Sequence, residues 1–468
     1  MRLDLKTGTD CNSNCVFCVI GDKLFTGDRS FEDCVEEMRL ARPTSDDIVF
    51  TGAEVTIRPD FLRLVAAARR LGYRNIQIQT NGRRFAYLDF CKAAIAAGAN
   101  EFSPSIHGPV ARLHDGLTRS PGSFEQIVAA IRNLRALGQR IVTNTVATRQ
   151  NMRHLPALAR LLVELRVDQY QIAFPHPTGH AATYFNGVVP RMRDLAPHVR
   201  AALQVGIDAG VGCMAEAMPY CQLPGYERHV AELQIPATEI AYDGFVVPDY
   251  ARDRMERGKT RFPQCASCRF EPMCEGPWRE YPAAVGGDEF QPVAGPRVVD
   301  TAVVLDDRFA RLGAPTPPLA AIDGLDEPWV AVVFYPEEGS PACTTQARSL
   351  AAGSAALGAA GIAYVRVCPD AATARAWGVV ENERFRRTTY LLGPAPGPGA
   401  PRPIRHILVA PDVHRHAAQI LDAVARYEAP PRPLARGPEL VVIRRAKPVA
   451  EVAAELSLSP ANPDEFAV

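Results

Sequence analysis

Cysteine is the residue type in this chain whose spacing most clearly indicates chemistry. The sequence contains 12 cysteines, and they are grouped rather than evenly spread. One group is Cys11, Cys15 and Cys18, a second is Cys213, Cys221, Cys265, Cys268 and Cys274, and a third is Cys343 with Cys368, whereas Cys34 and Cys91 stand alone. In a reducing compartment, thiolates bind iron or zinc or act as nucleophiles. The grouping therefore predicts three separate pieces of thiol chemistry.

The first group lies in the segment DCNSNCVFC, residues 10–18. If its three thiolates bind a four-iron cluster, one iron is left without a protein ligand and can accept a chelating molecule. A zinc site is the alternative that the same spacing allows. The secondary structure around this segment is needed to choose between an iron–sulfur cluster and a zinc site.

Strand and helix patterns alternate through the first two hundred residues. Apolar strand-like runs occur at 2–5, 48–51, 76–79, 101–106, 141–147 and 168–174. Segments such as PDFLRLVAAARRLG and SFEQIVAAIRNLRALG separate them, with apolar residues every three to four positions and a closing glycine. This alternation predicts parallel strands joined by crossover helices, in a barrel or partial barrel. The first cysteine group follows the first strand, so it should lie at the carboxyl edge, where such sheets bind ligands.

In this context the first cysteine group resembles the signature loop of radical S-adenosylmethionine (SAM) enzymes, including the aromatic Phe17 before the last cysteine. The segment Gly52-Ala53-Glu54-Val55 resembles the family's Gly-Gly-Glu-Pro segment, whose backbone and glutamate hold the amino group of SAM. Ala53 replaces the second glycine and Val55 replaces the proline. The resemblance implies that Gly52 and Glu54 contact SAM. Phe17 is expected either near the adenine or packed beneath the loop.

Other segments resemble the ends of later strands in the branch of this superfamily that includes molybdenum-cofactor and peptide-modifying enzymes. Thr80 and Asn81 stand in such a segment at the end of the third strand, Ser105 stands in one at the end of the fourth, and Asn144 lies in the fifth. The resemblance implies that these four residues bind SAM, although Ser105 and Asn144 can equally be ordinary polar residues that line a barrel.

The resemblance also implies the cofactors and the reaction. Cys11, Cys15 and Cys18 would hold a 4Fe-4S cluster whose open iron binds SAM. Reductive cleavage of SAM would give a 5'-deoxyadenosyl radical that abstracts hydrogen from a peptide or a small natural-product precursor. The protein would supply position and exclude water, while the cofactor would supply the chemistry.

The second cysteine group includes FPQCASCRFEPMCEG, in which Cys265, Cys268 and Cys274 have a spacing that resembles the SPASM or twitch region of the same superfamily. The resemblance implies one auxiliary 4Fe-4S cluster, and zinc is the alternative. Its fourth ligand is expected to be Cys221 rather than Cys213. Cys213 is expected to end a strand and point into the barrel, as a hydrogen donor to a substrate radical, a buried thiol or an alternative ligand.

After a segment rich in proline, glycine and alanine, a new strand-then-helix pattern begins at WVAVVFYPEEGSPACTTQARS. About 120 residues from here resemble peroxiredoxins of the Q type, also called bacterioferritin comigratory protein. The resemblance implies that Cys343 is the peroxidatic cysteine, with Ser340 and Arg387 as its partners, because a helix amino terminus and a guanidinium lower a thiol's pKa. Arg348 stands where the family has a resolving cysteine. Cys368 is expected to be a buried thiol or, alternatively, the resolving cysteine. A one-cysteine peroxidase that an outside thiol reduces is a further alternative.

Composition limits the partners. Lysine plus arginine equals aspartate plus glutamate at 52 each, so net charge predicts binding to neither nucleic acid nor a membrane surface. The chain opens MRLDLKTGTD, so neither a targeting segment nor a peptide-binding domain before the barrel is expected. No run of 18 apolar residues occurs, and a cytoplasmic location is expected. The expected partners are a peptide or small-molecule substrate, an electron donor such as ferredoxin or flavodoxin, and a thioredoxin-like thiol reductant.

The sequence thus predicts an α/β protein of three parts. The first is a partial (β/α)6 TIM-like barrel of the radical SAM type at 1–212, followed by a small auxiliary iron–sulfur region at 213–281. A linker at 282–297 leads to a thioredoxin-fold peroxiredoxin domain at 298–446, and a tail fills 447–468. The leading function is a radical SAM enzyme with a fused thiol peroxidase. The alternative is a redox sensor or cluster-bearing interaction protein with a degenerate peroxiredoxin domain.

Overall fold

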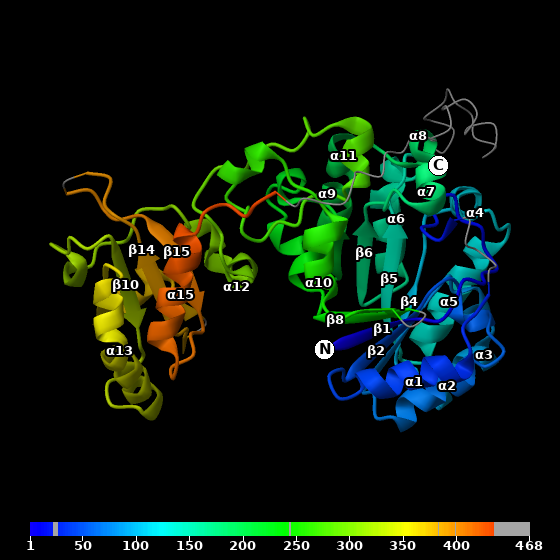
Figure 1. Ribbon diagram of the computed structural model, residues 1–468, viewed down its shortest axis with the longest axis horizontal. Helices are drawn as coiled ribbons and strands as arrows, with labels where there is room; N and C mark the ends of the chain where they lie inside the picture. The colour runs from blue at the N-terminus through cyan, green and yellow to red at the C-terminus, as the bar shows by residue number, and fades with distance from the viewer. Residues whose placement is uncertain (22–26, 243–244, 382, 398, 435–468) are drawn as a thin grey trace. The chain divides into compact units, whose positions relative to one another are not determined.

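The structure is a computed structural model that describes residues 1–21, 27–242, 245–381, 383–397 and 399–434 (Figure 1). Contacts within the chain divide it into two units. Among the described residues, the first unit comprises Met1–Arg261 and Glu275–Phe290, and the second comprises Phe262–Cys274 and Gln291–Leu434. The predicted tail at 447–468 and the last part of the predicted C-terminal domain lie outside the described residues. Along the described part of the chain, no helix is long and apolar enough to cross a membrane.

The first unit is built on a parallel sheet whose neighbouring strands follow one another in the sequence. The strands run in the order β7-β6-β5-β4-β3-β2-β1-β8-β9, and only the last pair is antiparallel. Their bounds are β1 Arg2–Lys6, β2 Asp47–Thr51, β3 Asn75–Thr80, β4 Glu101–Pro104, β5 Arg140–Val146, β6 Gln169–Ala173, β7 Gly212–Glu216, β8 Thr238–Tyr242 and β9 Phe245–Val247. The α/β class and the six predicted strands are confirmed. The β8–β9 pair beside β1 was not predicted.

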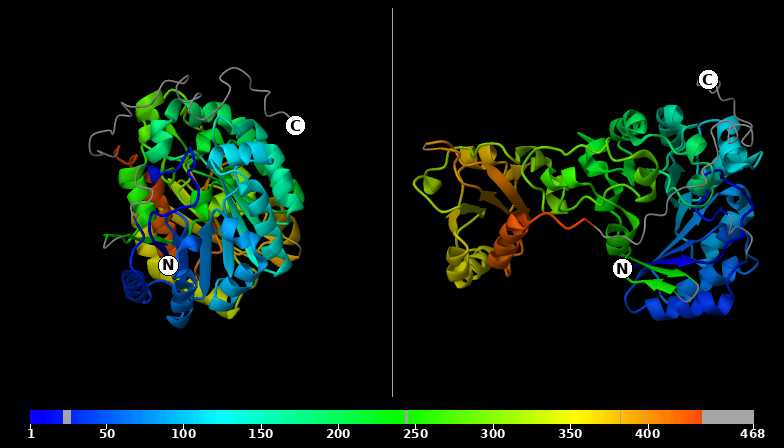
Figure 2. Two further views of the ribbon diagram at one scale, coloured as in Figure 1. Left: turned by 90° about the vertical axis from the view of Figure 1, so that its right-hand side faces the viewer. Right: turned by 45° about the horizontal axis from the view of Figure 1, so that its top comes forward.

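Helices connect these strands and cover the outer face of the sheet (Figure 2). In α2, the buried residues Phe61, Leu64, Val65 and Ala68 recur every three to four positions and so form one apolar face. The helices are α1 Phe31–Ala41, α2 Phe61–Arg70, α3 Leu88–Ala97, α4 Ala111–Thr118, α5 Ser123–Ala136, α6 Leu155–Glu164, α7 Gly179–Thr183, α8 Phe185–Val188, α9 Met192–Ala209, α10 Tyr250–Asp253 and α11 Glu280–Val285.

The inner face of the sheet is polar, in contrast to the packed apolar interior of a closed barrel. On β1, Leu3 and Leu5 are fully buried toward the helices, whereas Arg2, Asp4 and Lys6 line an internal cavity. Because successive strand side chains point to opposite faces, the alternation of apolar and polar residues forms a core on one side and a hydrophilic cavity on the other.

The second unit contains a four-stranded mixed sheet in the order β11-β10-β14-β15. β10 (Trp329–Phe334) is parallel to β11 (Ile362–Val367) and antiparallel to β14 (Thr388–Leu392), which pairs in turn with β15 (Ile404–Val409). The helices are α12 Thr301–Leu305, α13 Pro341–Ala359, α14 Ala371–Trp377 and α15 His416–Glu428, and a small hairpin joins β12 Val380–Glu381 to β13 Arg384–Phe385. α13 and α15 contribute Leu350, Leu357 and Ile420 to one core with β10.

The predicted linker at 282–297 contains ordered, packed structure. It includes the last residues of α11 and the buried Phe290, whose ring lies 6.3 Å from that of Tyr281. The hydroxyl of Tyr281 donates to Glu289 and accepts the backbone N–H of Met192, 2.8 Å away. Residues 275–290 therefore form part of the first unit, and they return to it after the segment 262–274, which belongs to the second.

Candidate functional site

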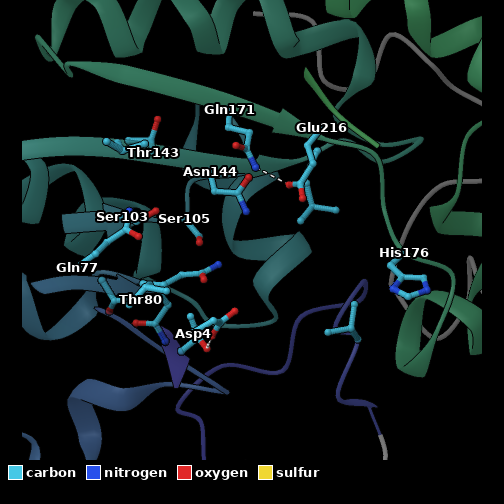
Figure 3. Close-up of a pocket in the computed structure, with 18 of the residues that line it drawn as sticks. Asp4, Gln77, Thr80, Ser103, Ser105, Thr143, Asn144, Gln171, His176 and Glu216 are labelled. Carbon is cyan, nitrogen blue, oxygen red and sulfur yellow. Dashed lines mark hydrogen bonds between the residues drawn. The ribbon is translucent and has the colours of Figure 1, made fainter. Parts of the chain in front are cut away.

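A cavity of about 810 Å³ occupies the inner face of the first unit's sheet. Its lining side chains come from every strand from β1 to β7, and Figure 3 shows polar groups of several strands turned toward the same space, among them Asp4, Gln77, Ser103, Asn144 and Gln171. Cys11, Cys15 and Cys18 also line it. The predicted position of the cysteine loop, at the carboxyl edge of the sheet, is confirmed.

The cysteine loop is held from both sides by backbone hydrogen bonds. The N–H of Asn14 donates to the carbonyl of Thr118 at 3.1 Å, and the N–H of Val16 donates to that of Leu117 at 2.9 Å. The carbonyl of Cys18 accepts the N–H of His180 at 2.8 Å. These contacts come from the end of α4 and the start of α7, so the loop path is fixed by elements far away in the sequence.

Side chains from the end of β3 complete this support. The amide of Asn81 donates to Asn12 Oδ1 at 2.6 Å, and the guanidinium of Arg83 donates to the Asn12 carbonyl. His180 Nδ1 lies 3.0 Å from the carbonyl of Cys15. Asn81 therefore contacts the loop that carries the cysteines, a positioning role that the sequence did not indicate.

Cys11 and Cys15 lie in an environment that disfavours ionisation of their thiols. Burial, with a further contribution from Glu54, raises the pKa of Cys11 to about 12. Burial and the neighbouring Cys11 and Cys18 thiols raise the pKa of Cys15 as well. A bound iron cluster would favour the thiolates because it supplies the compensating positive charge.

In the described part of the chain, no three His, Cys, Asp or Glu side chains converge closely enough to bind a single metal ion. The ligands of an iron–sulfur cube each bind a different iron and so need not converge on one point. The donor set, three cavity-facing thiols, fits such a cluster.

Gly52 forms a close approach that only glycine permits. Its φ is +117°, and a Cβ at this position would lie 2.7 Å from the carbonyl oxygen of Gly8. The next residue, Ala53, donates its N–H to the same oxygen at 3.0 Å, and Glu54 donates its N–H to the carbonyl of Asp10 at 2.9 Å. The segment therefore lies against the chain that leads into the cysteine loop. Gly52 and Ala53 line the cavity, where backbone groups can contact SAM.

The carboxylate of Glu54 is engaged within the protein. It is 2% exposed and accepts hydrogen bonds from the hydroxyl and N–H of Thr56, from Thr80 Oγ1 at 2.7 Å and from the N–H of Asn81 at 2.6 Å. Burial still raises its pKa above the ordinary value. In this arrangement Glu54 and Thr80 join the end of β2 to the end of β3. Contact between Glu54 and the SAM amino group stays a prediction.

Phe17, Ser105 and Asn144 all line the cavity. Phe17 is buried and packs edge-on against His107, with 4.5 Å between ring centroids. Ser105 and Asn144 form a parallel bridge between the strand ends. The structure therefore brings these predicted residues together in the same cavity as the cysteine loop.

Several cavity residues were not predicted from the sequence. Gln171 on β6 donates its amide N–H to the carboxylate of Glu216, the last residue of β7 (Figure 3). Trp278 also lines the cavity, and its ring stacks face to face on that of His176 at 4.0 Å. Alternation along QYQIA and CMAE could have indicated Gln171 and Glu216, whereas no local pattern links Trp278 to a cavity formed by strands.

Cys213 corrects a prediction. It is the second residue of β7 rather than its end, and it does not point into the barrel: its thiol lies 3.4 Å from the carbonyl of Leu203 on α9. The neighbouring Met214 and Glu216 line the cavity, so the side-chain alternation turns Cys213 toward the helix layer. A role as hydrogen donor in the cavity is therefore wrong.

The second unit contains Cys265, Cys268 and Cys274 in one compact loop. The carbonyl of Cys265 accepts the N–H of Cys268 at 2.9 Å, and the N–H of Cys274 donates to Phe270 at 2.8 Å. The thiol of Cys268 accepts the N–H of Val293 at 3.3 Å. Cys221 belongs to the first unit, in the 3-10 helix Tyr220–Gln222. Its role as fourth ligand stays a prediction.

Cys343 occupies the first turn of α13 and is fully buried. Ser340 is the N-cap, and its hydroxyl accepts the N–H of Cys343 at 3.4 Å. The guanidinium of Arg387, directly before β14, lies 3.3 Å from the Cys343 sulfur. Burial opposes ionisation, but the hydrogen bonds of Ser340 and Arg387 outweigh it and lower the pKa of Cys343 below its ordinary value. The three predicted residues are brought together.

Two residues that the sequence did not indicate hold Arg387 in place. Gln346, one turn along α13 from Cys343, accepts from Arg387 at 2.6 Å and contacts His416 Nδ1 at 2.8 Å. His416 Nε2 lies 2.8 Å from the hydroxyl of Thr389. Burial lowers the pKa of His416 to about 4, so its neutral ring can accept a hydrogen bond at one nitrogen and donate one from the other.

Cys368 is exposed, so the prediction of a plain buried thiol is wrong. It follows the end of β11, where the chain turns outward, and its thiol lies 3.5 Å from the carbonyl oxygen of Pro336. The next backbone N–H, that of Glu337, contacts the Cys343 thiol. The two sulfurs therefore lie at opposite edges of the peptide group that joins Pro336 to Glu337.

Comparison with known protein families agrees with the site in the first unit. Residues 5–162 match the Radical SAM superfamily model, and this part of the chain is a radical SAM domain. The family uses a 4Fe-4S cluster and SAM, which are therefore the cofactors of this domain. The match ends well before the second unit begins.

Similar curated proteins are enzymes that share the same region. The chain is 33% identical to the AdoMet-dependent heme synthase of Oleidesulfovibrio alaskensis over 135 residues, which is 29% of this chain and 34% of that protein. It is 29% identical to the enzyme of the same name from Methanosarcina barkeri, over 36% of this chain and 49% of that protein. The chain is 26% identical to a probable GTP 3',8-cyclase of Saccharolobus islandicus, over 36% of this chain and 55% of that protein. The chain thus spans about a third to a half of these relatives.

Among solved structures, Streptococcus suis SuiB bound to the precursor peptide SuiA aligns with a TM-score of 0.43 and 14% identity, over 53% of this chain and 59% of that one. A structure of native anSMEcpe with bound AdoMet aligns with a TM-score of 0.38 and 16% identity, over 45% of this chain and 64% of that one.

Proposed function

We propose that this chain is a radical SAM enzyme that cleaves SAM reductively and abstracts hydrogen from a peptide or a small natural-product precursor. One observation carries the proposal: the cysteine loop 11–18 opens onto a polar cavity of about 810 Å³ at the carboxyl edge of the sheet. A cavity of this size can hold SAM together with part of a substrate.

Residues of this chain would hold the cofactors and protect them. Cys11, Cys15 and Cys18 would bind the cluster, and the backbone at Gly52 and Ala53 would contact SAM. When bound, the cluster and SAM supply one-electron cleavage of the sulfonium bond and a radical that abstracts hydrogen. Phe17 and His107 form a buried aromatic wall beside the loop, which would exclude water.

Reductive SAM cleavage tests this proposal. The full chain would be purified and loaded with iron and sulfide under anaerobic conditions, and then reduced with dithionite in the presence of SAM. We expect 5'-deoxyadenosine and methionine in equal amounts. If the loop carries a four-iron cluster and neither product forms, the enzyme proposal is wrong and the cluster-bearing interaction protein is favoured. An electron donor such as ferredoxin or flavodoxin would replace dithionite in the cell.

We also propose one auxiliary 4Fe-4S cluster on Cys265, Cys268 and Cys274, with Cys221 as the fourth ligand. The compact loop of the three cysteines and the N–H contact to Cys268 support it, because N–H donors to cysteine sulfur are common at such clusters. We expect about eight iron atoms per fully loaded chain, and about four in Cys268→Ala. A fully loaded chain with about four irons that Cys268→Ala leaves unchanged would contradict this cluster.

A second candidate activity, thiol peroxidase, is proposed for the second unit. The contact between Arg387 and Cys343 at the start of α13 supports it, and so does the strand order, which suits the predicted thioredoxin fold. The Cys343 thiolate would attack one peroxide oxygen, so that the O–O bond breaks and a sulfenic acid and an alcohol or water form. The thiol of Cys368 would then attack the sulfenic sulfur and release water, giving a disulfide that a thioredoxin-like dithiol reduces.

Peroxide consumption with a dithiol reductant tests this activity. We expect it to be lost in Cys343→Ser. In Cys368→Ser we expect one turnover and then accumulation of the sulfenic acid, which dimedone traps. Consumption that survives in Cys343→Ser would rule out this site, and a Cys368→Ser variant that turns over like the wild type would mean that an outside thiol resolves Cys343.

A further inference from the structure

Glu216 is a cavity-facing carboxylate without a cationic partner. It ends β7, lines the cavity, and accepts a hydrogen bond from the neutral amide of Gln171 (Figure 3). Among the residues that the structure describes, no Lys, Arg or His pairs with it, although many other carboxylates of the chain have such a pair. Glu216 is half-buried, and a cation bound directly to a partly desolvated carboxylate stabilises it.

The charged groups near Glu216 are already paired with one another. Lys259 Nζ lies 2.6 Å from Glu232 and 3.0 Å from Glu275, and Arg254 holds Glu275 with two hydrogen bonds of 2.9 and 2.8 Å. Two cations thus balance two carboxylates, and Glu216 is the third carboxylate of the group. Its one unbalanced negative charge gives this end of the cavity an acidic character.

Two other carboxylates that line the same cavity, Asp4 and Glu101, differ from Glu216 in this respect. Asp4 contacts Lys6 Nζ at 3.0 Å, and Glu101 contacts Arg140 Nε at 2.8 Å. These pairs belong to the chain itself. Glu216 lies at the carboxyl edge of the sheet, where the cysteine loop also lies. A ligand in the cavity can therefore supply the cation that pairs with Glu216.

We propose that Glu216 binds a positively charged nitrogen of the substrate, either a primary ammonium or a guanidinium. The inference rests on the proposed function, because it assumes that the substrate enters this cavity. Burial is the main cause that raises the pKa of Glu216, and the nearby Glu232 adds to it, whereas Lys259 and Arg254 act in the opposite direction.

The wall beside this network suits the carbon part of such a substrate. Trp278 lies 4.9 Å below Lys259 Nζ, which places it next to the charged group, and it stacks on His176. This flat pair lines the cavity, so an aliphatic stem can lie against it while its charged end reaches Glu216. The substrate class that fits is a basic amino compound, such as a lysine or arginine side chain of a peptide.

Calorimetric titration of the cluster-loaded full chain tests the proposal, with SAM present so that its own site is filled. The probe is n-butylammonium, which has the atoms of a lysine side chain, and 1-butanol is its uncharged counterpart. We expect Glu216→Gln to weaken n-butylammonium binding by about tenfold or more and to leave 1-butanol binding unchanged. Glu101→Gln is the matched control, since its carboxylate already has Arg140, and it should bind like the wild type.

Three outcomes would overturn the site assignment: a wild type that prefers 1-butanol, a Glu216→Gln variant that binds like the wild type, or an equal loss in Glu101→Gln. If Glu216→Gln weakened SAM binding and left the probe unaffected, Glu216 would belong to the cofactor site instead. SAM cleavage in the same preparation separates the two proposals. Intact cleavage without cation binding contradicts only the Glu216 site, whereas cation binding without cleavage contradicts only the enzyme.

Discussion

The cysteine loop of the first unit and the Cys343 site of the second place thiols in opposite environments. Burial and neighbouring thiols raise the pKa values of Cys11 and Cys15. The pKa of Cys343 is lowered although the residue is fully buried. Burial alone therefore does not determine whether a thiol ionises, because the groups that contact the sulfur also shift its pKa.

The difference lies in the donors that each sulfur meets. Arg387 places a guanidinium 3.3 Å from the Cys343 sulfur, at the start of a helix whose dipole also favours a negative charge. The loop thiols instead repel one another as thiolates, and Glu54 adds to the effect at Cys11. The first site needs a metal to hold its thiolates, whereas the second can form its thiolate alone.

The largest expected effect is loss of the first site's metal in Cys15→Ala. Removing one of three ligands should abolish iron binding at the loop, so that the iron content falls by about four atoms per chain. Cys34→Ala is the control, because Cys34 is a buried thiol on α1 away from the loop. Unchanged iron in Cys15→Ala would mean that the loop does not carry the cluster.

A smaller but still large effect is expected for Glu54→Gln. An amide cannot accept all the hydrogen bonds that Thr56, Thr80 and Asn81 donate to the carboxylate, and an unsatisfied buried group costs about 1–3 kcal/mol. We expect SAM binding, measured by equilibrium dialysis, to weaken at least about tenfold. Thr80→Val removes one hydrogen-bond donor and should weaken SAM binding less than Glu54→Gln does. If Thr80→Val had the larger effect, Glu54 would not organise this region.

Arg387→Met should remove the feature that distinguishes the second site. Without the guanidinium the pKa of Cys343 rises, so alkylation of Cys343 at pH 7, followed by mass spectrometry, should slow by roughly tenfold. The difference should vanish at high pH, where the thiol is ionised in both proteins. Arg366→Met is the control, since Arg366 packs over the Tyr335 ring and should leave alkylation unchanged. If Arg387→Met left the alkylation rate of Cys343 unchanged, the Arg387 contact would not lower the pKa of this thiol.

The lowered pKa also has a stability consequence with a definite sign. Near the folded-state pKa of Cys343, the folded chain binds fewer protons than the unfolded chain. Its contribution to stability is therefore present at higher pH and is lost as the pH falls through that pKa.

The smallest expected effect compares two N-caps. Ser340 caps α13 beside Cys343, and Ser30 caps α1, where its hydroxyl accepts the N–H of Asp33 at 3.0 Å. Each Ser→Ala change should cost about 1 kcal/mol of stability, measured by thermal unfolding. Only Ser340→Ala should also slow Cys343 alkylation. Equal slowing in both variants would show that the change is not local.

The sequence indicated the parts of this molecule that depend on local pattern. The six predicted strands, the cysteine loop at their carboxyl edge, and the Cys343–Arg387 pair follow from side-chain periodicity and from motif segments, both of which are read within a short window. The direction of the Cys213 side chain was predicted wrongly because an error of position within β7 reverses the face to which a residue points, whereas the alternative of a buried thiol is confirmed.

The rest depends on contacts between distant segments. Asn81 and Arg83 donate hydrogen bonds to Asn12, which lies 69 and 71 positions earlier in the sequence. No local pattern in either segment predicts these contacts. Trp278 lines a cavity of strands although it follows the cysteine segment 265–274. The balanced group of Arg254, Lys259, Glu232 and Glu275, which leaves Glu216 unpaired, appears only when three chain segments meet.

The central claim, that the two thiol sites perform independent chemistries, is tested most directly by a crossed assay. SAM cleavage and peroxide consumption would be measured on the same preparations of Cys15→Ala and Cys343→Ser. We predict that Cys15→Ala forms no 5'-deoxyadenosine but still consumes peroxide, and that Cys343→Ser shows the reverse. Loss of both activities in either variant, or of neither, would contradict the account.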